Sequence, residues 1–331
     1  MRILTFSEFL LENKGPAFAH KVQLFNETED ADAFSWHVPG AELFKLINTA
    51  DDFNSSMPVL LYDNQKENKA FVNSISKGTA YNSPDGILAG KVAIAKRLSA
   101  DNCPWMPRTV FTKDEASSLK FPIIAKANNT YDSLGVEKIE SLKALNKLNG
   151  YDVYQEAIII EREFRIVVFA GLKNPVRKVL LVLEKIPKNA KAKRLRVEES
   201  LDIEELKNSD NTKFSWIHHP LSILAELKGI NEILNTVLNL NPTLNLSGID
   251  VAVDPEGKVW FIEHNTRASM LSNQSVLAYK AIYEDFYGKQ MCEDKELISF
   301  ADAHFKASAN LYPFEKVGDV THNLALKRYD K

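Results

Sequence analysis

The chain has few cysteines and no long apolar run, and each shortage excludes a class of protein. Its 331 residues include two cysteines, Cys103 and Cys292, which lie far apart and in no metal-binding or redox spacing. They predict neither a disulfide scaffold nor a cysteine-ligated metal, and they fit a reducing compartment. No apolar run reaches membrane-spanning length, and the N-terminus shows no signal-peptide pattern. We expect a cytoplasmic protein without a membrane partner.

The chain also lacks a large net charge of either sign. The formal net charge is −3, so no global field favours a nucleic acid, and we expect no nucleic-acid partner. With 45% hydrophobic residues, a chain of this length can bury a substantial core and is expected to form more than one lobe. The basic run 185–196 contains six Lys and Arg residues and no acid, and we interpret it as a mobile loop.

The most informative stretch is 248–267, GIDVAVDPEGKVWFIEHNTR. Residues 248–253 alternate in the manner of a strand, residues 254–257 are a turn signal, and residues 258–263 predict a second strand. The stretch therefore predicts a β-hairpin.

If Asp254 pairs with Gly257, Asp250 lies opposite Phe261 and Glu263 is its diagonal neighbour. One face then carries the acids among apolar side chains: Asp250, Ala252, Val259, Phe261, Glu263 and Asn265. The other face predicts core: Ile249, Val251, Val253, Trp260 and Ile262. Like charges this close repel unless a cation lies between them, and Mg²⁺ usually binds one or two carboxylates plus phosphate oxygens. The alternative is the solvated face of an ordinary hairpin.

The spacing of an Asp, twelve residues, a Glu, one residue and an Asn resembles the metal-binding end of the ATP-grasp superfamily. That superfamily includes D-alanine–D-alanine ligase, glutathione synthetase and the ribosomal-protein glutamate ligases. The resemblance implies that Asp250, Glu263 and Asn265 hold two Mg²⁺ ions on the phosphates of ATP, with Mn²⁺ as a substitute. It also implies that Arg267, just past these ligands, holds a substrate carboxylate or an oxyanion.

Two lysines upstream match the phosphate-binding lysines of the same superfamily. A helix is predicted to begin at Ser83-Pro84-Asp85 and to contain Lys91. The alternative for Lys91 is a solvated helix lysine. A buried-looking strand ends at Lys126, and the loop after it resembles the phosphate-covering lid only in part, through Ser133 and Gly135.

The next strands match the nucleotide-binding half of the superfamily. The resemblance implies that the adenine-binding hinge is formed by Gln155, Glu156, Ala157 and Ile158. It implies that Glu163 binds the ribose, because a carboxylate can accept both hydroxyl protons of a vicinal diol. Arg165 matches an arginine on the substrate or phosphate side, and Lys185 is a weaker candidate for the γ-phosphate. The alternative is a cross-strand Glu–Arg ion pair on a sheet surface.

Several matches in the right order imply an α/β (α+β) architecture of the ATP-grasp type. Two α+β lobes are expected to grip ATP, preceded by a smaller N-terminal lobe. The boundaries we expect are 1–82 for the N-terminal lobe, 83–155 for the small lobe with its lid, 156–285 for the large lobe with the metal site, and 286–331 for a helical tail. Other predicted elements are helices near 6–11, 41–47 and 221–240 and a strand over 58–62.

The resemblance implies a carboxylate–amine ligase that works through an acylphosphate. The partners would be a small-molecule or peptide carboxylate and an amine acceptor. A phosphotransferase and a non-catalytic ATP-binding protein are the alternatives. The tail either packs on the core or forms a homodimer contact, and both stay open. The opening MRILTFSEFLLE resembles N-terminal segments of large tailed bacteriophage proteins, which would place the protein in a host cytoplasm.

Overall fold

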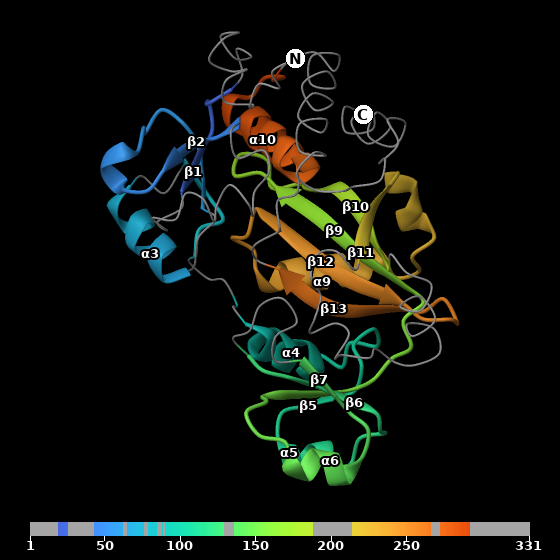
Figure 1. Cartoon of the computed structure of the whole chain (residues 1–331). Helices are drawn as coiled ribbons and strands as arrows, with labels where there is room; N and C mark the ends of the chain where they lie inside the picture. Colours follow the sequence, from blue (N-terminus) through green and yellow to red (C-terminus); the bar gives the residue numbers. More distant parts are fainter. Residues whose placement is uncertain are drawn as a thin grey trace, which may run out of the picture.

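The structure is a computed structural model, and three β-sheets organise it (Figure 1). It describes residues 19–25, 43–61, 65–75, 79–84, 88, 90–128, 136–187, 214–265 and 272–291. The helix predicted near 6–11 and most of the predicted tail lie outside these residues. The mixture of sheets and helices confirms the α/β class. In the described part of the chain, no helix has the length and apolar character needed to cross a membrane.

The first sheet is parallel, with strand order β2-β1-β3-β4. Its elements are β1 (Gln23–Phe25), β2 (Lys45–Ile47), the 3-10 helix η2 (Ala50–Asp52), β3 (Val59–Leu61), α3 (Gln65–Ser74) and β4 (Ala80–Tyr81). The strand predicted at 58–62 is therefore confirmed. The helix predicted at 41–47 was wrong over β2, because pairing with β1 decides the conformation of this short apolar segment.

The second sheet is antiparallel, with strand order β5-β8-β6-β7, and it forms a small lobe with two short helices. Its elements are β5 (Thr109–Val110), α5 (Lys113–Ala116), β6 (Ile123–Lys126), β7 (Val136–Ile139), α6 (Leu142–Lys147) and β8 (Val153–Glu156). Thr112 and Glu115 form a capping box at the start of α5, and Ser141 caps α6. One buried cluster, which includes Ile123 and Leu145, holds sheet and helices together.

The third sheet is antiparallel and carries most of the candidate site residues. Its strand order is β11-β10-β9-β12-β13. The strands are β9 (Arg162–Ala170), β10 (Arg177–Pro187), β11 (Phe214–His219), β12 (Leu246–Val253) and β13 (Val259–Asn265). The basic run predicted as a loop therefore begins inside β10, where Lys185 pairs with Trp216.

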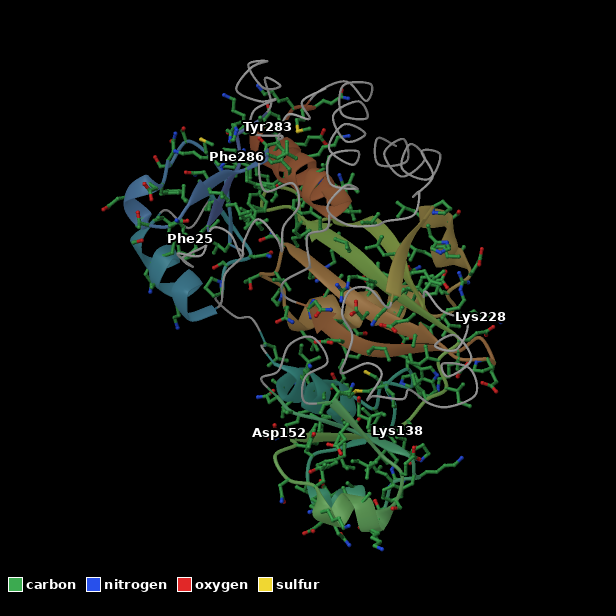
Figure 2. The ribbon with its side chains drawn as sticks, in the orientation of Figure 1. Phe25, Lys138, Asp152, Lys228, Tyr283 and Phe286 are labelled. Atoms are coloured by element: carbon green, nitrogen blue, oxygen red, sulfur yellow. The ribbon has the colours of Figure 1, made fainter. Side chains whose placement is uncertain are left out.

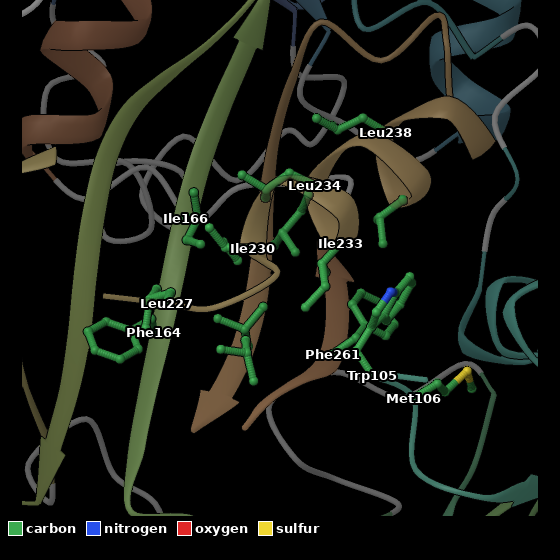
Figure 3. Close-up of a cluster of buried hydrophobic side chains, with 14 of the residues drawn as sticks. Trp105, Met106, Phe164, Ile166, Leu227, Ile230, Ile233, Leu234, Leu238 and Phe261 are labelled. Atoms are coloured by element: carbon green, nitrogen blue, oxygen red, sulfur yellow. The ribbon is translucent and has the colours of Figure 1, made fainter. Parts of the chain in front are cut away.

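Helices cover both faces of this sheet. On one face the apolar stripe of α9 (Ile230–Leu240) packs on Ile166 and Phe261, as Figure 3 shows. On the other face α10 (Ser272–Tyr287) packs on Phe169 and joins the sheet to the N-terminal strands. The helix predicted at 221–240 is divided into a 3-10 turn (Leu221–Ala225) and α9, because Gly229 adopts a positive φ of 78° before α9 begins.

A partly buried carboxylate, Asp285, fixes α10 against its surroundings. In the sequence of α10, Asp285 stands between Tyr283 and Phe286, which are both labelled in Figure 2. It accepts hydrogen bonds from the Tyr81 hydroxyl at 2.7 Å and from the backbone N–H groups of Leu172 and Asn174 at 2.8 and 3.1 Å. A single side chain thus joins β4, the β9–β10 turn and α10. These bonds hold the N-terminal sheet against the large sheet.

The helix that carries Lys91 begins later than predicted. It is α4 (Lys91–Ala100), and its N-cap is Gly90, with φ 87° and ψ 150°. A side chain would be strained at such a φ, so glycine allows the chain to turn into the helix there. Ile94 and Leu98 bury α4 against the same cluster as α9. Lys91 therefore stands in the first turn of α4.

Candidate active site

The hairpin β12–β13 brings the two acids opposite each other, in a register that differs from the predicted one. Asp254 N–H donates to the Lys258 carbonyl, so the loop has three residues and Gly257 takes a φ of 79°. A bulge then shifts the register again, and Asp250 pairs with Glu263 directly. Both steps displace the strand by one residue.

The change of register corrects the predicted faces. Val251 pairs with Phe261 and Val253 with Val259, so Phe261 and Val259 lie on the buried face and not beside the acids. The predicted pairing of Asp250 with Phe261 was wrong, because a loop of three residues and a bulge replace the assumed two-residue turn. The bulge keeps Glu263 on the same side as Asp250.

Asp254 belongs to the turn and not to the site. Its carboxylate accepts from the Lys258 backbone at 2.8 Å and from the Trp260 indole at 2.7 Å. These bonds satisfy a buried acid and fix the loop that sets the hairpin register.

Arg165 lies opposite Asp250 on the neighbouring strand β9. Its Nε and Nη2 donate to the two carboxylate oxygens of Asp250 at 2.8 Å each, and Asn265 Nδ2 donates to Oδ2 at 3.1 Å. Burial alone would lower the pKa of Arg165, but the charge and hydrogen bonds of Asp250 outweigh it, and the pKa is raised. The structure therefore brings one candidate substrate residue and two candidate metal ligands into direct contact.

Glu263 faces the small lobe, where two lysines approach it. Lys91 Nζ lies 3.8 Å from its carboxylate. Burial lowers the pKa of Lys126 to about 8, the Glu263 charge raises it in part, and the nearby Lys91 charge lowers it again. The Lys91 side chain is 18% exposed, and it lies with Lys126 near the same acid.

Glu163 is paired with Lys185 from β10, at 3.5 Å. Arg165, two residues further on, forms its own cross-strand ion pair with Asp250. Both members of the Glu163–Lys185 pair are largely buried, with side chains 13% and 21% exposed. The candidate ribose acid and the candidate phosphate lysine thus adjoin the Asp250 group on one face of the sheet.

The four hinge residues span the end of β8, since Gln155 and Glu156 are its last two residues and Ala157 and Ile158 follow it. The Gln155 amide donates to the Thr109 hydroxyl, and the Glu156 carboxylate accepts from the Lys120 N–H at 3.0 Å. Both side chains therefore have partners within the protein. Ala157 N–H donates to the Pro122 carbonyl. Among the described residues, the backbone N–H of Ile158 donates to no other group. A hydrogen-bond donor is therefore available at the position where the resemblance expects adenine.

Asn128, two residues after Lys126, is a site residue that the sequence reasoning missed. Its Oδ1 accepts from the Val92 N–H at 3.2 Å, so it caps the first turn of α4, where Lys91 stands. Its own N–H donates to the carboxylate of Asp152 at 2.9 Å. Two features of the sequence could have indicated this role: Gly90 directly before Lys91, and a polar residue two positions after Lys126. Ser133, Gly135 and Arg267 lie outside the described residues.

A second ionic group lies on the other face of β9 and β10, directly behind Glu163 and Lys185. Arg162 makes two 2.9 Å bonds to Glu184, and His219 Nε2 lies 2.7 Å from the same carboxylate. Burial would raise the pKa of Glu184, but these partners outweigh it and lower the pKa. The side chains of this group join the three strands β9, β10 and β11. No spacing in the sequence predicted it.

His264 lies between the two candidate ligands on β13 but faces the core. Burial lowers its pKa to about 4, so the ring is neutral, and its Nδ1 lies 3.1 Å from the Asn241 amide. Its side chain is therefore a packing residue on the apolar face, while Glu263 and Asn265 point to the opposite side.

The donor set around Asp250 fits a hard cation. Within the described ranges, no three His, Cys, Asp or Glu side chains are arranged as a complete metal cage. Asp250, Glu263 and Asn265 supply two carboxylates and one amide, all from one hairpin. Mg²⁺ is commonly bound by one or two carboxylates plus substrate phosphates, so an incomplete protein shell is what this ion requires.

A family model described as D-ala D-ala ligase C-terminus matches residues 99–283, more than half of the chain. No curated protein matches. The D-alanine–D-alanine ligase of Bacillus anthracis aligns with a TM-score of 0.53 and 16% identity, over 86% of this chain and 99% of that one.

Two other solved structures are similar. D-alanyl-alanine synthetase A from Vibrio cholerae O1 biovar eltor str. N16961 has a TM-score of 0.53 and 12% identity, over 82% of this chain and 100% of that one. N5-carboxyaminoimidazole synthetase from Staphylococcus aureus, complexed with ADP, has a TM-score of 0.47 and 13% identity, over 75% of this chain; the chain spans 64% of that protein. The family match and the fold agree: the chain belongs to the D-ala D-ala ligase C-terminus family, within the ATP-grasp superfamily of ATP-dependent ligases that form C–N bonds.

Proposed function

We propose that this protein is an ATP- and Mg²⁺-dependent carboxylate–amine ligase that forms an amide through an acylphosphate. One observation carries the proposal. Asp250 and Glu263 lie in register on one hairpin, with Arg165 on one side and Lys91 of α4 and Lys126 of β6 on the other. Acidic side chains that can bind a metal and basic side chains that can bind phosphate would then surround a bound triphosphate.

The nucleotide is proposed to lie between the small and large lobes. Lys91, Lys126 and Lys185 would contact phosphates, as point charges on a helix and two strands. Glu163 would accept both ribose hydroxyls, and Ile158 would offer its free N–H to adenine. Ser133 and Gly135 are proposed to add lid contacts.

Asp250, Glu263 and Asn265 are the proposed metal ligands. Mg²⁺ bound there would neutralise charge on the transferring phosphate. Arg165 and Arg267 are proposed to hold the substrate carboxylate or the oxyanion, because a guanidinium fork matches either. The catalysis that these residues supply is positioning and electrostatic stabilisation.

The proposed reaction balances without a covalent enzyme intermediate. A carboxylate oxygen of the substrate forms a bond to the γ-phosphorus as the bond from that phosphorus to the bridging oxygen breaks, and ADP leaves. The amine then attacks the acyl carbon, loses a proton, and expels phosphate. The products are an amide, ADP and phosphate.

The carboxylate is proposed to belong to a small molecule or a peptide, and the acceptor to be an amine. The reaction would take place in the cytoplasm, and a homodimer is compatible with it. We also propose the lobe boundaries given above, with the ATP-binding lobes at 83–155 and 156–285.

The test is release of ADP and phosphate by the purified protein, with ATP, Mg²⁺ and a pool of amino acids. We expect turnover that requires both a carboxylate and an amine and is lost in the Asp250→Ala, Glu263→Ala double variant. Glu256→Gln, an exposed acid in the loop of the same hairpin, should retain it. A stable phosphorylated product without an amine requirement would indicate a phosphotransferase instead. Nucleotide binding without turnover would indicate a binding protein.

A further inference from the structure

Asp250 and Glu263 are not equally available to a cation. The Asp250 carboxylate is nearly enclosed, with a side-chain exposure of 10%, and both of its oxygens accept short bonds from Arg165. Glu263 is 37% exposed, and its contact with Lys91 is long, at 3.8 Å. A cation can therefore reach the carboxylate of Glu263, whereas the carboxylate of Asp250 is held by Arg165.

Opening Asp250 is costly while the site holds no anion. Both oxygens of Asp250 accept from Arg165, and Oδ2 also accepts from Asn265, so three of its roughly four acceptor sites are in use and a metal must compete with the Arg165 charge for the carboxylate. Breaking a buried ion pair by removing one partner leaves the other charge uncompensated and is strongly destabilising. Arg165 itself is 15% exposed, so water does not replace the carboxylate fully.

A phosphate group removes this obstacle. A guanidinium binds phosphate oxygens with the same two-pronged geometry that it uses for a carboxylate. When a nucleotide brings phosphates to the site, Arg165 can exchange Asp250 for an anion of the ligand, and Asp250 is released to the cation. Metal and nucleotide then favour each other's binding, because the nucleotide compensates the charge of Arg165 and the metal compensates the charge of Asp250 once their ion pair is separated.

We propose that Arg165 occupies Asp250 in the nucleotide-free protein and thereby suppresses binding of a divalent cation until a nucleotide arrives. This inference rests on the proposed function, since it concerns the same metal ligands. Arg165 is thus a positioning residue for metal loading, in addition to any contact with substrate.

The experiment measures Mn²⁺ binding to the nucleotide-free full-length protein by the loss of the electron paramagnetic resonance signal of free Mn²⁺. We expect weak binding to the wild type and binding about tenfold or more tighter to Arg165→Gln, since a competing charge is removed. Arg165→Lys keeps the charge but loses the fork, and it should fall between the two.

Arg162→Gln is the matched control. Arg162 is on the same strand and makes the same two-bond contact to an acid, Glu184, on the opposite face. Its loss should leave Mn²⁺ affinity unchanged, although it also removes a two-bond contact to an acid from the same sheet. The double variant Arg165→Gln, Asp250→Asn should lose the gain, which would assign the new affinity to Asp250.

The inference is overturned if the wild type binds Mn²⁺ alone as tightly as Arg165→Gln does, or if Arg162→Gln gains as much. If Arg165→Gln does not fold, the Arg165→Lys comparison decides, since equal affinity of Arg165→Lys and wild type also overturns it. These results are separate from the proposed function: turnover by the wild type with no gain in Arg165→Gln rejects the inference alone, whereas absence of Mg²⁺-dependent turnover rejects the ligase proposal.

Discussion

We predict that ATP binding depends on pH through Lys126. Burial lowers its pKa to about 8 in the nucleotide-free protein, with Glu263 opposing and Lys91 adding to the shift. Bound phosphates stabilise the charged lysine and return its pKa towards its ordinary value, so ATP binds the protonated form. About three quarters of the lysine is protonated near pH 7.5 and about one tenth near pH 9, which predicts affinity about 8-fold weaker at the higher pH. Affinity is therefore expected to fall as pH rises through about 8.

Isothermal titration calorimetry with a non-hydrolysable ATP analogue at the two pH values measures this change. Phosphate ionises near pH 6, so the ligand itself changes little over the interval. Buffers of different ionisation enthalpy should also reveal proton uptake on binding at the higher pH. Lys126→Met should bind more weakly and lose both effects. An affinity that stays flat between the two pH values in the wild type, without proton uptake, would refute the reasoning.

Three further predictions concern how the fold supports the site. Ile233→Ala removes a side chain that is 1% exposed beneath the hairpin and should lower the free energy of unfolding by about 2–5 kcal/mol in urea denaturation. Gly90→Ala places a Cβ 2.9 Å from Asn128 Oδ1 at a φ of 87°, so both the melting temperature and ATP affinity should fall; an unchanged affinity would separate Asn128 from the site. Tyr81→Phe removes one donor from Asp285 and should lower the free energy of unfolding by about 1–3 kcal/mol, without changing ATP affinity.

The sequence predicted the order of strands and helices well where apolar periodicity was strong. Strand 58–62, the hairpin and the apolar stripe of α9 all appear in the structure. Boundaries failed where one backbone angle decides them. Gly229 divides a continuous apolar pattern, and Gly90 delays the start of α4, because a positive φ leaves little trace in hydrophobic spacing.

The candidate site shows a different limit. Asp250 and Glu263 were placed on one face, yet their register was wrong by a loop residue and a bulge that cancel in their effect on which face each acid occupies. The partner of Arg165 could not be read from local spacing, because Asp250 lies 85 residues away along the chain and meets it only through pairing of β9 with β12. Long-range strand pairing is invisible to a local pattern.

The central claim is that a substrate carboxylate attacks ATP, and oxygen-18 transfer tests it most directly. The protein is incubated with ATP, Mg²⁺ and a pool of amino acids labelled with oxygen-18 in their carboxylates, and the released phosphate is analysed by mass spectrometry. An acylphosphate predicts phosphate that carries one labelled oxygen, at a rate that falls in the Asp250→Ala, Glu263→Ala variant. Phosphate released without label while an amide accumulates would contradict the account.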